Sequence, residues 1–394
     1  MRRLYILLVV SIIAGILAIY SSWCVAERSY NLAKALSERQ DYVSDEIYYV
    51  DTARRYLQNI FNINITYYKY SNKTDKNYYN LEHPPLGKYI IALAMIKCGD
   101  KPLCWKMPSV IESGLIPLIL YAGFLVRGLR AKSPAWIAAG GLAALAASSD
   151  KILHIDGSVA MLDIHLAFFT ALAIALGIAV GYKTHMAAGA VATTVKMSGL
   201  AAVGGAFLAL ILDSIASRRW RDALKAFSLV VIVVLIAWII IYLPLMTFFG
   251  PSKLYHETIA ALKWHTSSRP PGPPTSTPIG WIFNTNPFIL SYSLVDAAAE
   301  TTTIVTGSAL LAAIALSLYS LALAVRGRRY AWPVGSLTLV ASYLMYALIY
   351  ILGNHTFYSF YAVQMTPAAA ASLGELTAIG LGGAQAWKSV KSSQ

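Results

Sequence analysis

Long apolar runs recur along this sequence, and they constrain the fold more than any other feature. A helix of about 20 apolar residues spans the hydrocarbon core of a bilayer, and lipid tolerates only helices or closed barrels. Only 13% of the 394 residues are charged, about half the share found in a soluble domain. The alternating ten-residue segments of a barrel do not occur. The sequence therefore predicts an all-α polytopic membrane protein.

Eight apolar segments and one interrupted region are expected to cross the membrane. The eight segments are residues 4–23, 108–127, 134–149, 159–182, 224–248, 300–325, 331–353 and 357–382. Region 185–213 is predicted to form two shorter spans that break near Lys196. One continuous helix would place this ammonium group near the bilayer centre, at a cost of about 3 kcal/mol. The total is about ten transmembrane helices.

Basic residues gather in alternate connections between these segments. With the N-terminus in the cytoplasm, the inner connections and ends hold 15 basic residues and two acids, Asp213 and Asp222. This bias follows the positive-inside rule and predicts a plasma-membrane protein with both termini cytoplasmic. The outer side then carries two large loops, 24–107 and 249–299, with surface helices expected at residues 86–97 and 254–265. Neither loop is long enough for a separate soluble domain, so residues 1–394 are predicted to form one domain.

Two further features suit an outer location for these loops. Sequons of the glycosylation type occur at Asn64, Asn72 and Asn354, all in predicted outer segments. Cys98 and Cys104 bracket a short outer loop, where a disulfide and a pair of free thiols are both compatible with the spacing.

Charged side chains that suit group transfer collect in the same outer segments. The acids are Asp45, Glu46 and Asp163, and the cations are Lys88, Lys106, Lys196 and Arg269. A carboxylate can take a proton from an acceptor while cations hold a leaving phosphate. The alternatives are a solvated acidic surface at residues 45–46 and a turn-capping role for His83. Asp163 and Lys196 lie in apolar surroundings, where a charge generally has a partner or a function.

The order of these motifs resembles that of the dolichyl-phosphate-mannose protein mannosyltransferases, which are membrane glycosyltransferases of the GT-C fold. The matching motifs are Asp45-Glu46, His83-Pro-Pro-Leu-Gly-Lys88, Lys106-Met-Pro-Ser109, Ala160-Met-Leu-Asp163, Val195-Lys196-Met-Ser-Gly199-Leu, His265-Thr-Ser-Ser with a Pro-rich stretch that contains Trp281, and Phe357-Tyr-Ser-Phe-Tyr361. They are collinear over nearly the whole chain. The extra extramembrane domain of eukaryotic members has no counterpart, so the chain resembles a minimal prokaryotic form.

The resemblance implies an inverting transfer of mannose from a polyprenyl (dolichyl) phosphate to a Ser or Thr hydroxyl of a protein. The reaction would take place at the outer membrane face, with Asp45 as the catalytic base. Glu46 and His83 are expected to bind the acceptor. Lys106, Lys196 and Arg269 are expected to bind the donor phosphate, and Lys88, Asp163 and His265 to support the site.

Two departures from the family pattern affect the donor contacts. Lys106 stands where the family usually has Arg, and Ser158 stands where it tends to have Arg. Lysine keeps the charge of arginine but lacks the planar fork that binds phosphate through two hydrogen bonds. The identity of the sugar is therefore less constrained than the identity of the base.

Three alternatives remain open from the sequence. The same motifs would serve transfer to a lipid or glycan acceptor. A transporter with a midplane site at Lys196 is opposed by the gathering of charges at one face. The scheme requires no cofactor, although Glu82, His83 and His265 could assemble a divalent metal site. Residues 266–280 are expected to close over the substrates, and no motif predicts nucleic acid as a partner.

Overall fold

The computed structural model describes residues 2–39, 41–68, 74–75, 77–270, 275–290, 298–299 and 303–382, and helices dominate them. The strands within these residues form one short antiparallel pair, β1 (Phe288–Ile289) with β2 (Ala298–Ala299). The expected all-α class is confirmed.

The α-helices of the described residues are α1 (Arg2–Arg39), α2 (Glu46–Arg55), α3 (Leu86–Cys98), α4 (Pro102–Ala131), α5 (Pro134–Ser149), α6 (Lys151–Asp156), α7 (Leu162–Ala179), α8 (Tyr182–Ala192), α9 (Leu200–Ser217), α10 (Trp220–Phe249), α11 (Pro251–Thr266), α12 (Pro278–Phe283), α13 (Thr303–Val325), α14 (Val334–Ile351) and α15 (Thr366–Gly382). Three shorter turns are the π-helical η1 (Tyr56–Ile60) and the 3-10 turns η2 (Met197–Gly199) and η3 (Ser359–Met365). The helices expected at residues 86–97 and 254–265 correspond to α3 and α11.

Seven of the described helices are long and apolar enough to cross a membrane. They are α1, α4, α7, α9 with the turn before it, α10, α13 and α14. Three other expected spans fall on α5, α8 and α15, which have 16, 11 and 17 residues and are shorter than about 20. The last expected span, 357–382, loses its first turns to η3. A count of ten crossings therefore remains a prediction, whereas the integral membrane character does not depend on it.

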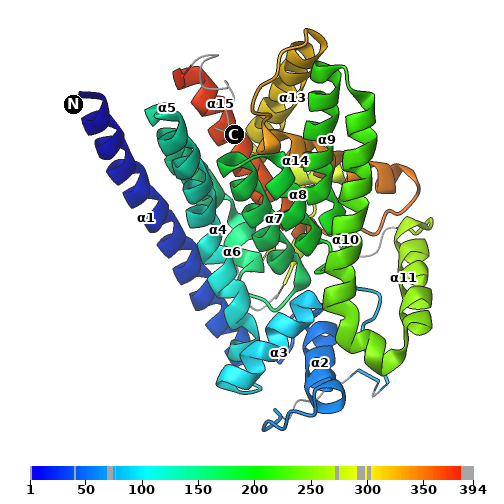
Figure 1. Ribbon diagram of the computed structural model, residues 1–394. Coiled ribbons are helices and arrows are strands. Elements are labelled where there is room, and N and C mark those ends of the chain that lie inside the picture. The colour runs from blue at the N-terminus through cyan, green and yellow to red at the C-terminus, as the bar shows by residue number, and fades with distance from the viewer. Residues whose placement is uncertain are drawn as a thin grey trace.

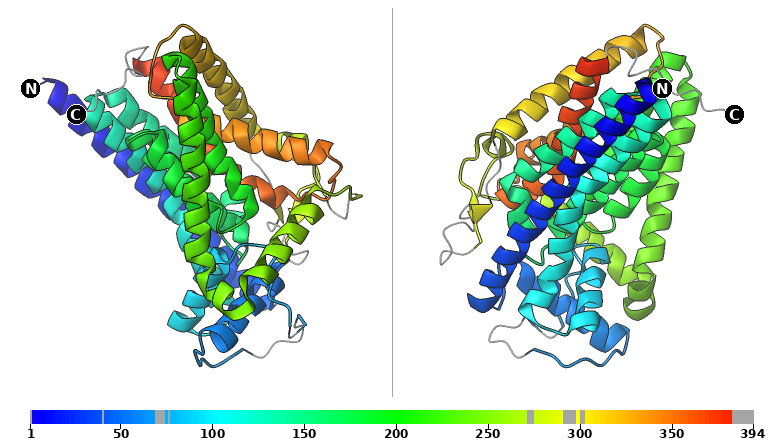
Figure 2. Two further views of the ribbon diagram at one scale, coloured as in Figure 1. Left: turned by 45° about the vertical axis from the view of Figure 1, so that its right-hand side comes forward. Right: turned by 90° about the vertical axis from the view of Figure 1, so that its left-hand side faces the viewer.

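The helices form one elongated bundle, in which α1, α4, α5, α7 and α15 pack side by side (Figures 1 and 2). The start of α1 and the end of α15 lie at the same end of the bundle, and α2 and α3 lie at the opposite end. Small residues allow the close packing of α1 on α4, since a Cβ at Gly114 would stand 2.7 Å from the Ala26 methyl group. The outward sides of α1 and α10 expose apolar side chains such as Ile16 and Ile239, as contact with lipid requires.

The chain breaks near Lys196, as the sequence predicts. Helix α8 ends at Ala192, Lys196 has an extended backbone, and η2 leads into α9. Gly199 makes the reversal possible, because a Cβ there would stand 2.4 Å from the carbonyl oxygen of Ala192. Lys196 is buried in protein, with 7% of its surface exposed.

The first backbone N–H groups of α14 are satisfied by a side chain from a distant helix. Glu375 of α15 is fully buried and accepts hydrogen bonds from the backbone N of Gly335 (2.9 Å) and of Ser336 (2.9 Å). The Ser336 hydroxyl donates a third, at 2.7 Å. A helix otherwise leaves its first N–H groups without partners, so this carboxylate fixes α14 against α15.

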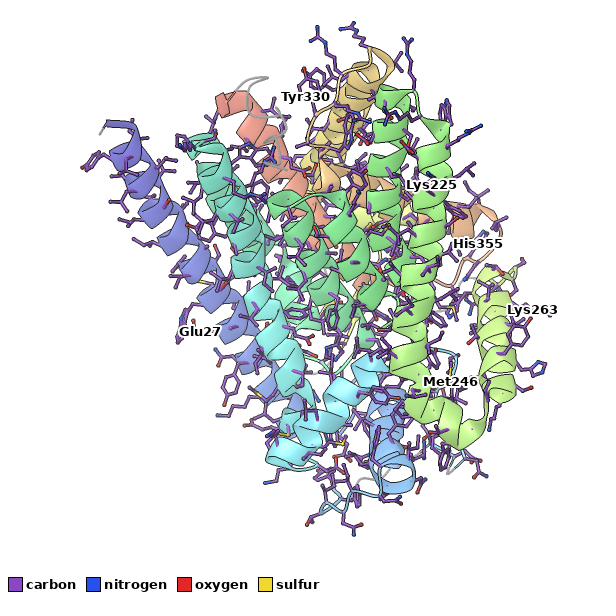
Figure 3. The ribbon with its side chains drawn as sticks, viewed as in Figure 1. Glu27, Lys225, Met246, Lys263, Tyr330 and His355 are labelled. Carbon is purple, nitrogen blue, oxygen red and sulfur yellow. A yellow bond between two sulfur atoms is a disulfide. The ribbon has the colours of Figure 1, made fainter. Side chains whose placement is uncertain are left out.

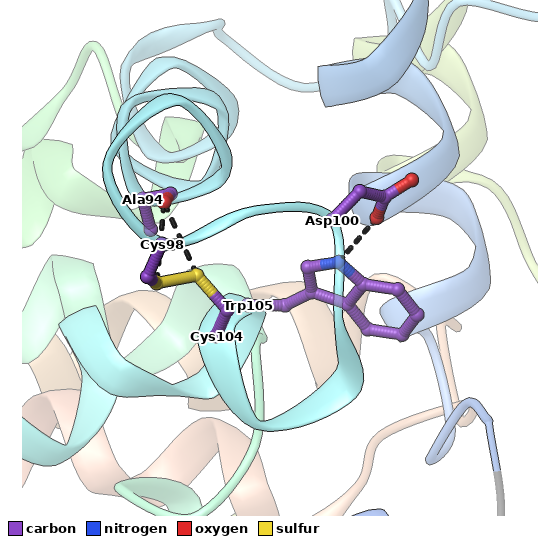
Figure 4. Close-up of a disulfide and its surroundings, with 5 residues drawn as sticks. All are labelled: Ala94, Cys98, Asp100, Cys104 and Trp105. Carbon is purple, nitrogen blue, oxygen red and sulfur yellow. Dashed lines mark hydrogen bonds between the residues drawn. A yellow bond between two sulfur atoms is a disulfide. The ribbon is translucent and has the colours of Figure 1, made fainter. Parts of the chain in front are cut away.

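Cys98 and Cys104 form a disulfide across the turn between α3 and α4 (Figure 4). The spacing alone left this bond and two free thiols equally open. Next to it, the Trp105 indole donates a hydrogen bond of 2.6 Å to Asp100, which also pairs with Arg54 of α2. This cluster, buried in the protein, joins α2 to the start of α4.

Helix α10 runs the length of the bundle, with Lys225 toward one end and Met246 toward the other (Figure 3). It ends at Gly250, whose φ of +81° favours glycine, and Pro251 starts α11 in a new direction. Helix α11 therefore lies beside the bundle and carries its last residues, Trp264 and His265, back toward the segment between α14 and η3, where Asn354 donates to the carbonyl oxygen of His265.

Candidate active site

Asp45 stands at the start of α2, directly after the link that follows α1. Ser44 before it has a φ of +52°, and this turn sets the direction of α2. The Asp45 carboxyl is half-buried and lines a cavity of about 660 Å³. We call this the polar cavity.

The polar cavity is built by residues from four stretches of the chain, 45–49, 74–83, 264–269 and 356–361. Its lining residues are Asp45, Tyr48, Tyr49, Thr74, Asp75, Tyr78, Asn80, Glu82, His83, Trp264, His265, Arg269, Thr356, Tyr358 and Tyr361. The loop before α3, the end of α11 with the segment after it, and η3 with the segment before it thus converge on Asp45 and the start of α2. The structure brings together Asp45, His83, His265 and Arg269, all of which the sequence nominates.

A second cavity of about 220 Å³ adjoins the polar cavity and is mostly apolar. Leu200, Leu262, Met345, Ile349 and Phe357 contribute to its walls, and Leu200 and Leu262 are about half exposed. We call this the apolar cavity.

His83, His265 and Tyr361 line both cavities, so the two spaces meet at these side chains. Lys196 lies in the wall of the apolar cavity. The junction therefore combines a cation with an apolar chamber on one side and a hydrated, carboxylate-bearing chamber on the other.

The environment of Asp45 suits a base that works near neutral pH. Burial raises the pKa of Asp45 from its usual value to about 6, against the opposing attraction of Lys196. The negative charges of Asp163 and Glu82 raise the pKa further, and a hydrogen bond with Tyr49 lowers it. At pH 7 this carboxyl is mostly ionised and able to accept a proton.

His83 and His265 face each other with ring centroids 5.6 Å apart. Burial and the charge of Lys196 lower the pKa of His83 well below its usual range and that of His265 to about 4. Both rings are therefore neutral at pH 7, and they offer hydrogen bonds at the junction without adding charge.

Lys196 is held in place by two contacts. Its Nζ donates a hydrogen bond of 2.8 Å to Oδ1 of Asp163 and lies 4.1 Å from the centre of the Tyr361 ring. Asp163, at the start of α7, thus positions the cation that stands at the junction.

Glu46 and Lys106 form a fully buried ion pair, and neither is among the described residues that line the polar or the apolar cavity. Oε2 of Glu46 accepts from Nζ of Lys106 at 2.9 Å and from the backbone N of Val43 at 2.8 Å. Oε1 accepts from the backbone N of Ala160 at 2.6 Å. The pair therefore ties the start of α2 to α4 and to the segment before α7, directly beside Asp45.

Lys88 fixes the loop that carries the His83-Pro-Pro turn. Its fully buried Nζ donates to the carbonyl oxygens of Asn80 (2.5 Å) and His83 (2.6 Å) and to Oδ1 of Asn80 (3.2 Å). Burial lowers the pKa of Lys88 to about 7. Through these contacts Lys88 supports Asn80 and His83, which line the polar cavity.

Arg269 approaches the polar cavity from the segment after α11. Its backbone pairs with residues 353–355 through hydrogen bonds from Arg269 N to Gly353 O and from His355 N to Arg269 O. The guanidinium lies 4.6 Å from the centre of the Trp264 ring and is half-buried. Among the lysines and arginines that the structure describes, Arg269 is the one whose side chain lines the polar cavity.

The sequence left open a divalent metal site at Glu82, His83 and His265, all of which are described residues. Among them, no group of three or more His, Cys, Asp and Glu side chains is arranged to hold a metal ion. Glu82, His83 and His265 all line the polar cavity, but the described side chains do not bring them together as a ligand set.

Several cavity tyrosines were not nominated from the sequence. Tyr49, Tyr78, Tyr358 and Tyr361 line the polar cavity, whereas tyrosines near a membrane generally suggest interfacial anchoring. The sequence signal that could have indicated Tyr358 and Tyr361 was the run of aromatic residues at 357–361, which is one of the motifs that carry the resemblance. Which of the nominated residues act in catalysis stays a prediction.

The comparisons with known proteins bear on the fold. No known protein family matches this sequence, and no curated protein matches it either. Among solved structures, ArnT from Cupriavidus metallidurans bound to undecaprenyl phosphate is similar, with a TM-score of 0.54 and 15% identity over 92% of this chain. The apo state of the same protein has a TM-score of 0.49 and 14% identity over 94% of this chain. This chain spans 59% of the length of the ArnT chain in both comparisons. The likeness to the lipid-bound structure establishes that the chain has the fold of ArnT, which is the GT-C fold.

Proposed function

We propose that this protein is an inverting glycosyltransferase that moves a sugar from a polyprenyl phosphate to a hydroxyl acceptor. The observation that carries the proposal is the meeting of the apolar and polar cavities at a junction beside Lys196, with Asp45 in the polar one. A polyprenyl-phosphate sugar has a lipid tail, an anionic phosphate and a polyhydroxylated ring. These three parts match, in the same order, the apolar cavity, the cation Lys196 and the polar cavity.

The donor lies across the junction in this proposal. The first isoprene units occupy the apolar cavity, and the phosphate lies near Lys196 and the neutral rings of His83 and His265. Arg269 provides a second cation at the polar cavity. The similar structure of ArnT was solved with undecaprenyl phosphate bound, which supports a polyprenyl phosphate as the lipid partner here.

The reaction is a single displacement at the anomeric carbon. Asp45 accepts the proton of the acceptor hydroxyl as its oxygen forms a bond to C1 of the sugar. The bond between C1 and the phosphate oxygen breaks at the same time, and the electron pair stays on the phosphate, which the cations stabilise. Attack on the face opposite the phosphate inverts C1, so no covalent enzyme intermediate is needed.

Glu46 and Lys106 have a different assignment from the one that the resemblance implies. Their mutual hydrogen bond and complete burial support a role in holding Asp45 in place rather than contacts with acceptor or phosphate. The phosphate contacts are assigned to Lys196 and Arg269, and acceptor contacts to His83.

The sugar and the acceptor follow from the resemblance to protein mannosyltransferases. We assign mannose as the sugar and a Ser or Thr hydroxyl of a protein as the acceptor, on the outer face of the plasma membrane. A lipid or glycan hydroxyl is the alternative acceptor. The opposite placement of the start of α1 and of α2 and α3 along the bundle (Figure 1) is compatible with a cytoplasmic N-terminus and an outer site.

The test uses the full chain in lipid nanodiscs with radiolabelled polyprenyl-phosphate-mannose and either a Ser/Thr peptide or a soluble mannoside. Wild type should release polyprenyl phosphate and label one acceptor. Asp45→Asn should lower kcat by about 100-fold or more, whereas Asp222→Asn should retain activity because Asp222 is exposed at the start of α10 and lines neither cavity. Unchanged turnover in Asp45→Asn would refute the mechanism. Labelling of the mannoside alone would show that the acceptor is a glycan hydroxyl and not a protein hydroxyl.

A further inference from the structure

The loop below His83 presents a carboxylate that the proposed displacement does not use. Oε1 of Glu82 accepts hydrogen bonds from the hydroxyl of Tyr78 and, at 2.7 Å, from Nδ2 of Asn80. Asn80 is itself held by Nζ of Lys88 through its backbone carbonyl and its side-chain oxygen. The orientation of the Glu82 carboxylate is therefore fixed by buried neighbours.

The second oxygen of Glu82 remains available to a ligand. No residue in the described part of the chain donates a hydrogen bond to Oε2, and the half-buried side chain lines the polar cavity. A carboxylate held through one oxygen can accept one or two hydrogen bonds from hydroxyl groups through the other.

The surroundings of Glu82 suit a neutral sugar ring. The ring of Tyr78 lies edge-on to that of Tyr48 with centroids 5.8 Å apart, and Trp264 and Tyr358 add further aromatic surface to the cavity. Aromatic rings can cover the C–H face of a sugar while a carboxylate binds its hydroxyls. The carboxylates of Asp45, Asp75 and Glu82 line this cavity, so an anionic sugar would be repelled.

The position of Glu82 favours the transferred sugar over the acceptor. His83, the next residue, lines both cavities, whereas Glu82 lines only the polar one. A sugar whose phosphate lies at the junction therefore extends its ring hydroxyls past His83 toward Glu82. Glu82 and Asp45 also line the same cavity, so a sugar whose C1 is attacked beside Asp45 has its ring within the space that Glu82 borders.

We propose that Glu82 determines donor specificity by accepting hydrogen bonds from adjacent hydroxyls of the transferred sugar, which is a neutral hexose. This inference rests on the proposed function and adds to it a residue that binds the donor sugar. Tyr78, Asn80 and Lys88 are positioning residues that hold the carboxylate toward the ring.

The test compares parent and deoxygenated donors in wild type and in Glu82 variants. The donors are polyprenyl-phosphate-mannose and its 3-deoxy and 4-deoxy analogues, and the assay follows release of polyprenyl phosphate in nanodiscs. Wild type should use one deoxy donor about 10- to 100-fold less efficiently in kcat/KM, the usual effect of a hydrogen bond to a charged group. In Glu82→Ala the parent and that deoxy donor should react at similar, low efficiency, while the acceptor KM stays unchanged. Glu82→Gln keeps the shape of the side chain and allows the same comparison of parent and deoxy donors if Glu82→Ala does not fold.

The control variant is Asp222→Asn, which removes an exposed carboxylate at the start of α10 outside both cavities and should preserve the discrimination between donors. If the Glu82 variants still discriminate as wild type does, or if only the acceptor KM rises, the assignment of Glu82 to the donor sugar is refuted. Either result leaves the transfer reaction itself intact. Wild-type protein that uses none of these donors would instead refute the proposed function.

Discussion

The protonation of Asp45 leads to a specific prediction about the pH dependence of the rate. Only the ionised carboxyl can take a proton from the acceptor, and burial raises its pKa to about 6. The wild-type kcat/KM should therefore rise with pH through an ascending limb centred near pH 6 and level off above pH 7. An unperturbed aspartate, with a pKa near 4, would give a flat profile over this range.

The size of the effect follows from the fraction of Asp45 that is ionised. With a pKa of about 6, roughly one carboxyl in eleven is ionised at pH 5 and roughly ten in eleven at pH 7. The rate should therefore differ by about tenfold between these two pH values. The midpoint of this limb gives the pKa of Asp45 in the free enzyme, because kcat/KM reflects the ionisation of groups in the unbound protein.

A neutral substitution near Asp45 should move this limb in a known direction. The negative charge of Glu82 raises the pKa of Asp45, so Glu82→Gln should shift the limb to lower pH when each profile is normalised to its own plateau. The assay is radiolabel transfer in nanodiscs from pH 4.5 to 8, with protein integrity checked at each pH.

Two results would refute this reasoning. A flat wild-type profile between pH 5 and 7 would show that Asp45 is not the titrating base. A limb near pH 6 that persists in the residual activity of Asp45→Asn would assign the titration to another group.

Three further predictions concern stability and modification. Lys106→Met should lower the free energy of unfolding by roughly 3–5 kcal/mol, since it leaves the buried carboxylate of Glu46 without its partner. Thermal unfolding should show that the double variant Lys106→Met/Glu46→Gln recovers part of the lost melting temperature. Equal melting temperatures for Lys106→Met and wild type would contradict the pairing. Cys98→Ser should cost about 2 kcal/mol, as expected for so short a disulfide loop, whereas the free Cys24→Ser is the control and should not change the melting temperature. Asn354 is 1% exposed and its Nδ2 donates to a backbone carbonyl of α11 at 2.7 Å, so mass spectrometry of the native protein should find it without a glycan despite its sequon, and a glycan there would contradict its burial.

Hydropathy and charge were sufficient to predict the helical class and the break near Lys196. Both depend on the cost of transferring polar groups into lipid, which acts on each segment independently of the rest of the chain. The lengths of α5, α8 and α15 were harder to predict, because helices buried among others can be shorter than the bilayer and still be apolar throughout.

The partners of the charged side chains could not be derived from the sequence. Glu46 and Lys106 are separated by 60 positions, and both were nominated for substrate contacts because they stand in motifs that carry the family resemblance. Their burial against each other depends on how α2 packs on α4, which no local pattern encodes. Asp45 was nominated by the motif and lies in the polar cavity, whereas Glu82 was considered only as a metal ligand.

The junction of the two cavities also has a kinetic consequence. In the proposed reaction, the loaded carrier would reach Lys196 from the apolar cavity, whose half-exposed lining residues include Leu200 and Leu262, whereas a water-borne acceptor would reach Asp45 through the polar cavity. Both substrates can then be bound at once, so initial rates should follow a sequential scheme rather than a ping-pong one. The spent carrier leaves by the route of the loaded one and competes with it alone. Turnover in the membrane would therefore depend on how quickly another enzyme removes or reloads the polyprenyl phosphate that this reaction releases.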